Sequence, residues 1–117
     1  MILYGIPNCD TVRKARKFLE QNNIPYQFHD FRKDGVTLEL LQTWLKQHPI
    51  TTLVNKRSTR WRQLNESQKE ALISHCELTT LIEHPTLIKR PVLQTDNTPN
   101  SPIIIGFKES EYQTLTP

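Results

Sequence analysis

The fold of this 117-residue chain is decided by residues 1–31, which read MILYGIPNCDTVRKARKFLEQNNIPYQFHDF. Residues 1–4 are apolar and suit a β-strand, and the Gly, Pro and Asn residues of segment 5–8 then break the strand into a loop. After Cys9, apolar residues recur at helical spacing with basic residues between them, which predicts an amphipathic helix that ends near residues 21–23. Cys9 is therefore expected where a loop gives way to a helix.

A second strand is predicted over residues 25–31. The order strand, crossover helix, strand forms a βαβ unit, whose two strands lie parallel with right-handed connectivity. Residues 91–94 and 103–105 also have strand patterns and predict an antiparallel hairpin, followed by a short closing helix over residues 109–115. The middle of the chain, at about residues 37–86, has helical patterns and predicts an all-helical insert. We therefore expect an α/β fold in a single domain that spans the whole 117-residue chain.

Composition limits the class of protein. The formal net charge is only +3 at pH 7 and aromatic residues make up 8% of the chain, so the sequence does not predict a nucleic-acid partner. No signal peptide and no segment of transmembrane length are visible, and we expect a cytoplasmic protein without a membrane partner. The two cysteines, Cys9 and Cys76, are too few for a secreted disulfide framework. The four histidines have no metal-ligand spacing, so no metal site is expected.

Cys9 is the candidate nucleophile. A cysteine reacts as its thiolate, and the unpaired N–H groups and the positive dipole end at a helix start stabilise an anionic sulfur. Arg13, one turn into the same helix, adds a nearby cation. The third position after Cys9 is Val12 rather than cysteine, so a mixed disulfide at Cys9 needs an external thiol to resolve it. Cys76 lies in the helical insert beside Ile73 and is expected to be a packing residue.

Motifs elsewhere in the chain accompany this cysteine. They are YGIPNCDTVRKA at residues 4–15, FHDFR at 28–32 with Asp34-Gly35, LVNKR at 53–57 with TRWRQL at 59–64, IKRPVL at 88–93, and Gly106-Phe107 with Tyr112. Together they resemble the arsenate-reductase-like ArsC/Spx/YffB family, with the closest likeness to YffB-type proteins, over nearly the whole chain. The resemblance implies a thioredoxin-like fold with a mixed four-stranded sheet, made of the parallel βαβ unit and the antiparallel hairpin.

The resemblance also implies roles for individual residues. Cys9 corresponds to the family's nucleophile, and Thr11 and Arg13 to positions in the loop that wraps a bound oxyanion. Arg90 corresponds to an anion-binding arginine, and Pro91 to a cis-proline that would bring the Arg90–Pro91 backbone against the thiol. Arg57 or Arg90 would meet the carboxylates of glutathione through charge-assisted hydrogen bonds. The residues expected to bind glutathione or the substrate are Asn8, Thr11, Arg13, Lys56, Arg57, Arg90 and Pro91.

The chain departs from the pattern of glutaredoxin-coupled arsenate reductases at several positions. Those enzymes carry a histidine four residues before the nucleophile and a hydroxyl three residues after it, where this chain has Gly5 and Val12. They also use three arginines around the oxyanion. The segment equivalent to the first arginine reads Asn55-Lys56-Arg57, and the region of the third holds Gly106-Phe107.

We therefore predict a glutathione-dependent thiol/disulfide oxidoreductase that uses Cys9 as its single nucleophile. Glutathione would be a co-substrate rather than a permanently bound cofactor. The expected partners are glutathione or glutaredoxin as reductant, and an oxidised thiol or an oxyanion as substrate. Two alternatives stay open. One is a glutaredoxin-coupled arsenate reductase, and the other is a non-catalytic regulator of the Spx kind that binds RNA polymerase through its α subunit.

Overall fold

The structure is a computed structural model, and it describes residues 1–96, 98 and 101–115. Contacts between residues divide the chain into two compact units. One joins Met1–Asp34 to Arg90–Pro117, and the other is Gly35–Lys89. The expectation of a single domain over residues 1–117 with an insert at about 37–86 stays a prediction, and residues 97, 99–100 and 116–117 of that span lie outside the described part.

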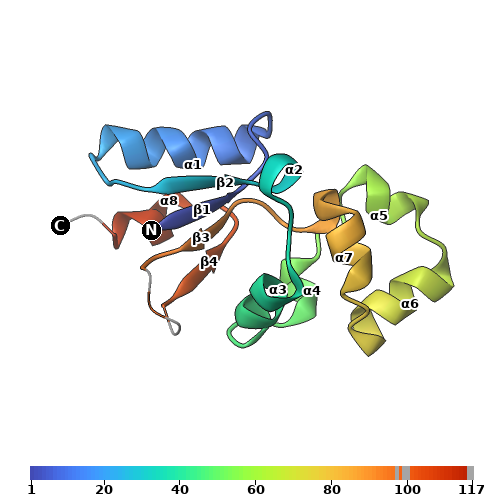
Figure 1. Ribbon diagram of the computed structural model, residues 1–117. Coiled ribbons are helices and arrows are strands. Elements are labelled where there is room, and N and C mark those ends of the chain that lie inside the picture. Colours follow the sequence, from blue (N-terminus) through green and yellow to red (C-terminus); the bar gives the residue numbers. More distant parts are fainter. Residues whose placement is uncertain (97, 99–100, 116–117) are drawn as a thin grey trace. The chain divides into compact units, whose positions relative to one another are not determined.

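The first unit contains a four-stranded sheet with the strand order β2-β1-β3-β4 (Figure 1). Its strands are β1 (Ile2–Gly5), β2 (Gln27–Asp30), β3 (Val92–Gln94) and β4 (Ile103–Ile105). β1 and β2 are parallel, as the crossover helix predicts. β3 runs antiparallel to both β1 and β4. The expected mixed sheet of an α/β, thioredoxin-like fold is confirmed.

Two strand boundaries differ from the prediction. Gly5 is the last residue of β1 and pairs with Asp30 of β2, so it does not break the strand. The second strand begins at Gln27 rather than residue 25. It ends before Phe31, which starts the one-turn helix α2 (Phe31–Asp34). The chain turns here because the Asp30 carboxylate accepts a hydrogen bond from the backbone N–H of Arg32 at 2.9 Å, a local bond that competes with the strand ladder.

Helix α1 (Asp10–Gln21) follows β1 and buries the face that its periodicity predicts. The buried residues of this face are Val12, Ala15, Phe18 and Leu19. The helix ends because Asn23 adopts a left-handed φ of 55°, a conformation that asparagine tolerates better than most residues. The N–H of Ile24 then donates to the Leu19 carbonyl at 2.9 Å. The predicted end near residues 21–23 is confirmed.

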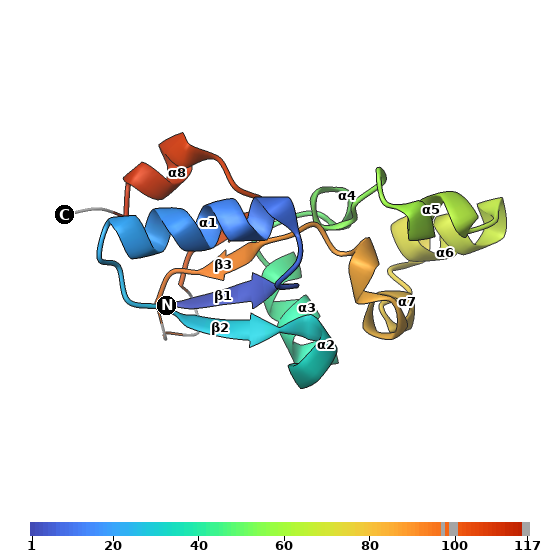
Figure 2. The ribbon, with the colours of Figure 1, turned by 90° about the horizontal axis from the view of Figure 1, so that it is seen from above.

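The core of the first unit lies between the sheet, α1 and the closing helix α8 (Glu109–Gln113) (Figure 2). Leu3 and Leu93 are opposite each other on β1 and β3, and both are fully buried. The rings of Phe18 and Tyr112 meet edge to face with centroids 5.9 Å apart, which joins α8 to α1. Each such side chain contributes about 1.5–3 kcal/mol by burial. The core therefore holds the start of α1 in a fixed position on the sheet.

The second unit is helical, as predicted for the insert, apart from one antiparallel bridge between Val54 and Ile88. Its helices are α3 (Leu38–Leu45), α4 (Ile50–Leu53), α5 (Thr59–Gln63), α6 (Glu66–His75), α7 (Thr79–Glu83) and the 3-10 helix η1 (Pro85–Leu87). Leucines from several of these helices, together with Trp44, are fully buried. Within the part of the chain that the structure describes, every helix is too short or too polar to cross a membrane.

Candidate functional site

Cys9 is the N-cap residue of α1. Its backbone is extended, with φ −98° and ψ 128°, and its carbonyl accepts the first helical hydrogen bond from the N–H of Arg13 at 2.9 Å. On the other side, its own N–H donates to the carbonyl of Ile6 at 3.2 Å and closes the loop after β1. The side chain is half-buried. The loop and the helix thus hold this thiol at the junction that the sequence predicts.

The thiol makes no capping hydrogen bond to the helix. Serine, threonine, aspartate and asparagine are the usual caps because their oxygen accepts from the first-turn N–H groups, and a neutral thiol is a weak acceptor. Those N–H groups and the positive end of a 12-residue helix remain available for an anion at this position. The first turn of α1 can therefore donate hydrogen bonds to an anion bound beside Cys9.

Arg13 pairs with Asp10 on the surface of α1. Its Nη1 lies 2.7 Å from Asp10 Oδ1, and the two side chains are 58% and 87% exposed. An exposed pair of this kind contributes at most about 1 kcal/mol, so a bound anion can compete for the guanidinium. The structure qualifies the expected role of Arg13 as a cation beside the thiol, because a carboxylate already offsets its charge.

Gly5 and Val12, on either side of the Cys9 loop in the sequence, pack against each other. Both residues are buried, and a Cβ atom added at Gly5 would lie 2.8 Å from Val12 Cγ2, closer than two carbons can approach. Val12 thus occupies the space that any side chain at residue 5 would need. The two departures from the arsenate-reductase pattern are in contact with each other, and a histidine at position 5 has no room unless Val12 changes as well.

Arg90 and Pro91 lie at the same end of the sheet as the Cys9 loop. Tyr4 pairs with Val92 in the antiparallel β1–β3 ladder, so the preceding dipeptide continues alongside the end of β1. The Arg90–Pro91 peptide is cis, as the resemblance implies. The Pro91 carbonyl accepts a hydrogen bond from the N–H of Gly106 at 2.8 Å. Gly106 has a φ of +82°, and the sequence alone did not predict its hydrogen bond to Pro91.

The guanidinium of Arg90 carries unsatisfied donors. Its Nε and Nη1 atoms are buried, and neither has a hydrogen-bond partner among the residues that the structure describes. Buried polar groups in proteins are normally hydrogen-bonded, and each unsatisfied one costs about 1–3 kcal/mol, more when it is charged. An arginine in this state suits an anion that supplies the missing acceptors.

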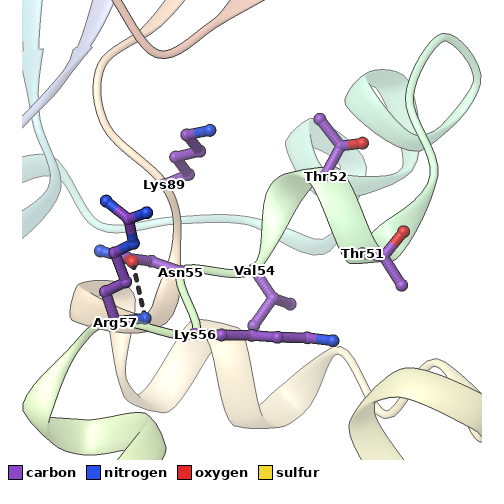
Figure 3. Close-up of a pocket in the computed structure, with 7 residues that line it drawn as sticks. All are labelled: Thr51, Thr52, Val54, Asn55, Lys56, Arg57 and Lys89. Atoms are coloured by element: carbon purple, nitrogen blue, oxygen red, sulfur yellow. Dashed lines mark hydrogen bonds between the residues drawn. The ribbon is translucent and has the colours of Figure 1, made fainter.

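Lys56 and Arg57 belong to the other unit. They follow Asn55, whose Oδ1 accepts from the N–H of Arg57 at 3.1 Å (Figure 3) and whose carbonyl accepts from the Ser58 hydroxyl at 2.9 Å. These local bonds fold residues 55–58 into a turn, which is the usual use of asparagine and serine between helices. The turn leaves the side chains of Lys56 and Arg57 exposed.

The remaining predicted residues are placed as follows. Asn8 is exposed and Thr11 half-buried, on either side of Cys9. The expectation that Cys76 packs in the insert is wrong. Helix α6 stops at His75, and Cys76 is its exposed C-cap with a left-handed φ of 48°. The backbone turns at this residue, and its side chain is exposed whereas Leu72 of the same helix is buried.

Comparison with known proteins gives the family. The model of the ArsC family matches residues 4–115, which is nearly the whole chain. The chain belongs to the ArsC family. An uncharacterized protein of Haemophilus influenzae is 48% identical over 95% of this chain and 94% of its own length. The solved structure of the YFFB protein is 34% identical, with a TM-score of 0.88, over 99% of this chain and 98% of its own.

A further relative is named as a regulator. It is the global transcriptional regulator Spx 2 of Bacillus cereus, 28% identical over 100% of this chain and 87% of its own length. The resemblance to the ArsC/Spx/YffB group is therefore confirmed. Of these three relatives only the Bacillus cereus protein is named for a role, so the activity has to be argued from this chain's own residues.

Lys89 is a polar residue near the candidate positions that sequence reasoning did not select. Its N–H donates to the Leu53 carbonyl at 2.8 Å, which places it next to the turn that carries Lys56 and Arg57. The signal was present as the cation directly before Arg90, but a single exposed lysine has no pattern that separates it from other surface lysines.

Proposed function

We propose that this ArsC-family chain is a monothiol oxidoreductase that reduces glutathionylated thiols with glutathione as co-substrate. The observation that carries the proposal is the position of Cys9, a half-buried N-cap thiol with no hydrogen-bonded cap and with Val12 where a second cysteine would stand. A thiol at such a helix start is favoured as a thiolate, and a single thiol suits a cycle with an external reductant.

In the first step the Cys9 thiolate attacks the glutathionyl sulfur of a mixed disulfide. A new S–S bond joins Cys9 to glutathione, and the substrate leaves as a thiolate that takes a proton from water. In the second step the thiolate of a free glutathione attacks the glutathionyl sulfur on Cys9. Oxidised glutathione leaves and the Cys9 thiolate returns. Each turnover therefore consumes one free glutathione, and the other half of the oxidised glutathione is the glutathionyl group taken from the substrate.

Arg90 is proposed to bind glutathione during this cycle, through guanidinium nitrogens that lack hydrogen-bond partners among the described residues. The carboxylates of glutathione are acceptors for Nε and Nη1, and a charge-assisted bond to a buried donor is stronger than one to an exposed donor. Asn8 and Thr11 are neighbours of Cys9 in the sequence and Pro91 lies at the same end of the sheet, and all three are proposed to contact the bound peptide. Lys56 and Arg57 are proposed to bind acidic groups of the substrate, on the basis of their exposed positive charge.

The test uses the two cysteines as each other's control. Wild type, Cys9→Ser and Cys76→Ser are incubated with oxidised glutathione, and the adducts are located by mass spectrometry of peptides. The proposal expects an adduct at Cys9 in wild type and Cys76→Ser, and its loss in Cys9→Ser. An adduct confined to Cys76, or none at all, would contradict it.

Arsenate reduction ranks below this activity. The contact between Gly5 and Val12 fills the position of the activating histidine with an isopropyl group, and leaves no hydroxyl three residues after Cys9. An assay for arsenite formation with glutathione and glutaredoxin tests the ranking. If the wild-type protein forms arsenite as fast as it reduces a glutathionylated peptide, the ranking of the two activities is wrong.

A second proposed function is regulation of transcription through the α subunit of RNA polymerase. It is favoured by the 28% identity with the Bacillus cereus regulator, which extends over the whole chain. Because Val12 replaces a second cysteine, such binding would not depend on a disulfide switch within this loop. Purified α subunit is expected to bind wild type and Cys9→Ser equally, and absence of binding in a titration of both would exclude this function.

A further inference from the structure

Asp10 directly follows Cys9 and places a carboxylate at the start of α1. It is the first residue of the helix, and its side chain is 87% exposed. The next acidic residue of the helix is Glu20, near the other end. The N-terminal end of a helix attracts anions. An anion that approaches Cys9 therefore meets a carboxylate that already occupies this favourable field.

The Asp10 carboxylate also engages the arginine of the first turn. Arg13 Nη1 donates to Asp10 Oδ1 at 2.7 Å, the length of a charge-assisted hydrogen bond. Arg13 is the residue that the family resemblance places in an oxyanion-binding loop. A ligand that recruits this guanidinium has to break its bond to Asp10 or share it with a second negative charge.

The charges of residues 9–13 cancel when the thiol is neutral, because Asp10 and Arg13 are the two charged residues of this segment. Arsenate and phosphate carry their charge on the oxygens around the central atom, so they bring it close to Asp10. In a glutathionyl disulfide the reacting sulfur is neutral and the carboxylates lie several bonds away. Charge repulsion weakens with distance, so the Asp10 carboxylate disfavours the first kind of ligand more than the second.

We propose that Asp10 is a specificity-determining residue, which disfavours small oxyanions at Cys9 and leaves attack on the neutral sulfur of a disulfide less affected. It repels the incoming anion directly and it holds Arg13 in an ion pair. This selectivity deepens the proposed function and rests on Cys9 as its nucleophile. It is separate from the contact between Gly5 and Val12, which acts through space rather than charge.

The first test compares alkylation of Cys9 by a charged and an uncharged reagent, at a constant ionic strength of about 0.1 M, where the Debye length is about 10 Å. Asp10→Asn removes the charge and keeps the size of the side chain. It should raise the ratio of the iodoacetate rate to the iodoacetamide rate at Cys9 about twofold. Asp10→Glu, which restores the charge, should keep the wild-type ratio. Added salt at about 1 M should reduce the difference between Asp10→Asn and wild type, because it screens the carboxylate.

The second test measures binding of an oxyanion, with inorganic phosphate as the probe. Phosphate does not oxidise a thiol and iodoacetamide is uncharged, so slower alkylation in the presence of phosphate reports phosphate bound beside Cys9. Asp10→Asn should lower the phosphate concentration that halves the alkylation rate by about threefold at the same ionic strength. In an Arg13→Gln background the effect of Asp10→Asn should be smaller, because the guanidinium that it releases is absent.

Glu109→Gln is the matched control. Glu109 is also an exposed acidic residue at the first position of a helix, and it lies beside Lys17 of α1. Lys17 follows Cys9 by eight residues, which is about 12 Å along a helix and therefore beyond the Debye length of the assay. The ratio and the phosphate effect at Cys9 should be those of wild type in this variant.

The outcomes separate the selectivity from the proposed function. Equal changes in Asp10→Asn and Glu109→Gln, an unchanged ratio in Asp10→Asn, or no protection by phosphate in Asp10→Asn would overturn the role of Asp10 while Cys9 stays the reactive thiol. An equal effect of Asp10→Asn with and without Arg13 would overturn the route through the ion pair. Absence of iodoacetamide labelling at Cys9 in wild type would contradict the proposed function itself, and the selectivity with it.

Discussion

The two cysteines of this chain stand at opposite ends of helices. Cys9 is the N-cap of α1, with extended backbone and a half-buried side chain. Cys76 is the C-cap of α6, with a left-handed φ of 48° and an exposed side chain. A helix places partial positive charge at its first residues and partial negative charge at its last, so the same thiol meets opposite fields at these two positions.

The contrast separates exposure from reactivity. If accessibility alone decided, Cys76 would be the reactive residue, since it is the more exposed of the two. Helix position predicts the reverse, because a thiolate at a helix start is stabilised and one at a helix end is not. The buried guanidinium nitrogens of Arg90 distinguish Cys9 further, because Arg90 lies at the end of the sheet from which the Cys9 loop leaves.

The largest expected effect is on turnover. With a glutathionylated peptide and glutathione as substrates, Cys9→Ser should lower the rate by at least about 100-fold, because it removes the nucleophile. Cys76→Ser should retain the wild-type rate. A comparable loss in both variants, measured by the release of oxidised glutathione, would remove the distinction between the two helix ends.

The next effect concerns the contact between Gly5 and Val12. Gly5→Ala should lower the free energy of unfolding by about 1–3 kcal/mol, because the new Cβ would meet Val12 Cγ2 at 2.8 Å. Urea denaturation measures the change. In a Val12→Ala background the same substitution should cost much less, since the opposing methyl groups are gone.

Gly35→Ala is the control for this cycle. Gly35 has a φ of +73° and nothing within 4 Å of an added Cβ, so its substitution acts through backbone strain alone. Its cost should be the same in the wild-type chain and in the Val12→Ala background. A Gly5→Ala cost that is equally insensitive to the Val12→Ala change would show that the two residues are not coupled.

The elements that sequence predicted well are those specified by local periodicity. Helix α1 and the strands at residues 92–94 and 103–105 follow from apolar spacing and from turn residues that act within a few positions. The contact of Gly5 with Val12 could not be predicted in this way, because a glycine two residues before a proline also fits a loop. Only the packing of α1 on β1 shows that Gly5 is a strand residue with no room for a side chain.

The environments of Cys76 and Arg90 show the same limit. Ala71, Leu72 and Ile73 suggest a continuing apolar face, but the helix ends after His75, and helix ends are the least certain part of a prediction. The identity of Arg90 follows from the motif, whereas its lack of hydrogen-bond partners depends on residues distant in the sequence. Candidate site residues can thus be predicted from the sequence, whereas their exposure and their hydrogen-bond partners cannot.

The third prediction tests the anion preference at Cys9. Iodoacetate and iodoacetamide differ in charge and react with thiolates by the same displacement of iodide. For Cys9, the ratio of the iodoacetate rate to the iodoacetamide rate should fall about tenfold in Arg90→Gln, which corresponds to about 1.4 kcal/mol. The ratio for Cys76 in the same sample should not change, and peptide mass spectrometry reads both. Arg90→Lys should restore part of the ratio, and an unchanged ratio at Cys9 would mean that the guanidinium does not act on anions there.

The smallest effect concerns the other helix end. A left-handed φ costs a non-glycine residue about 1 kcal/mol, and glycine is the preferred residue after the last turn of a helix. Cys76→Gly should therefore raise the free energy of unfolding by about 0.5–1 kcal/mol, while Cys76→Ala, which keeps the Cβ atom, should not. Urea denaturation distinguishes the two variants, and both should keep the wild-type turnover. A loss of turnover in the stabilised Cys76→Gly variant would show that the Cys76 thiol takes part in the reaction, and would break the contrast between the two cysteines. Stabilisation with full activity would show that residue 76 affects the protein through its backbone conformation alone.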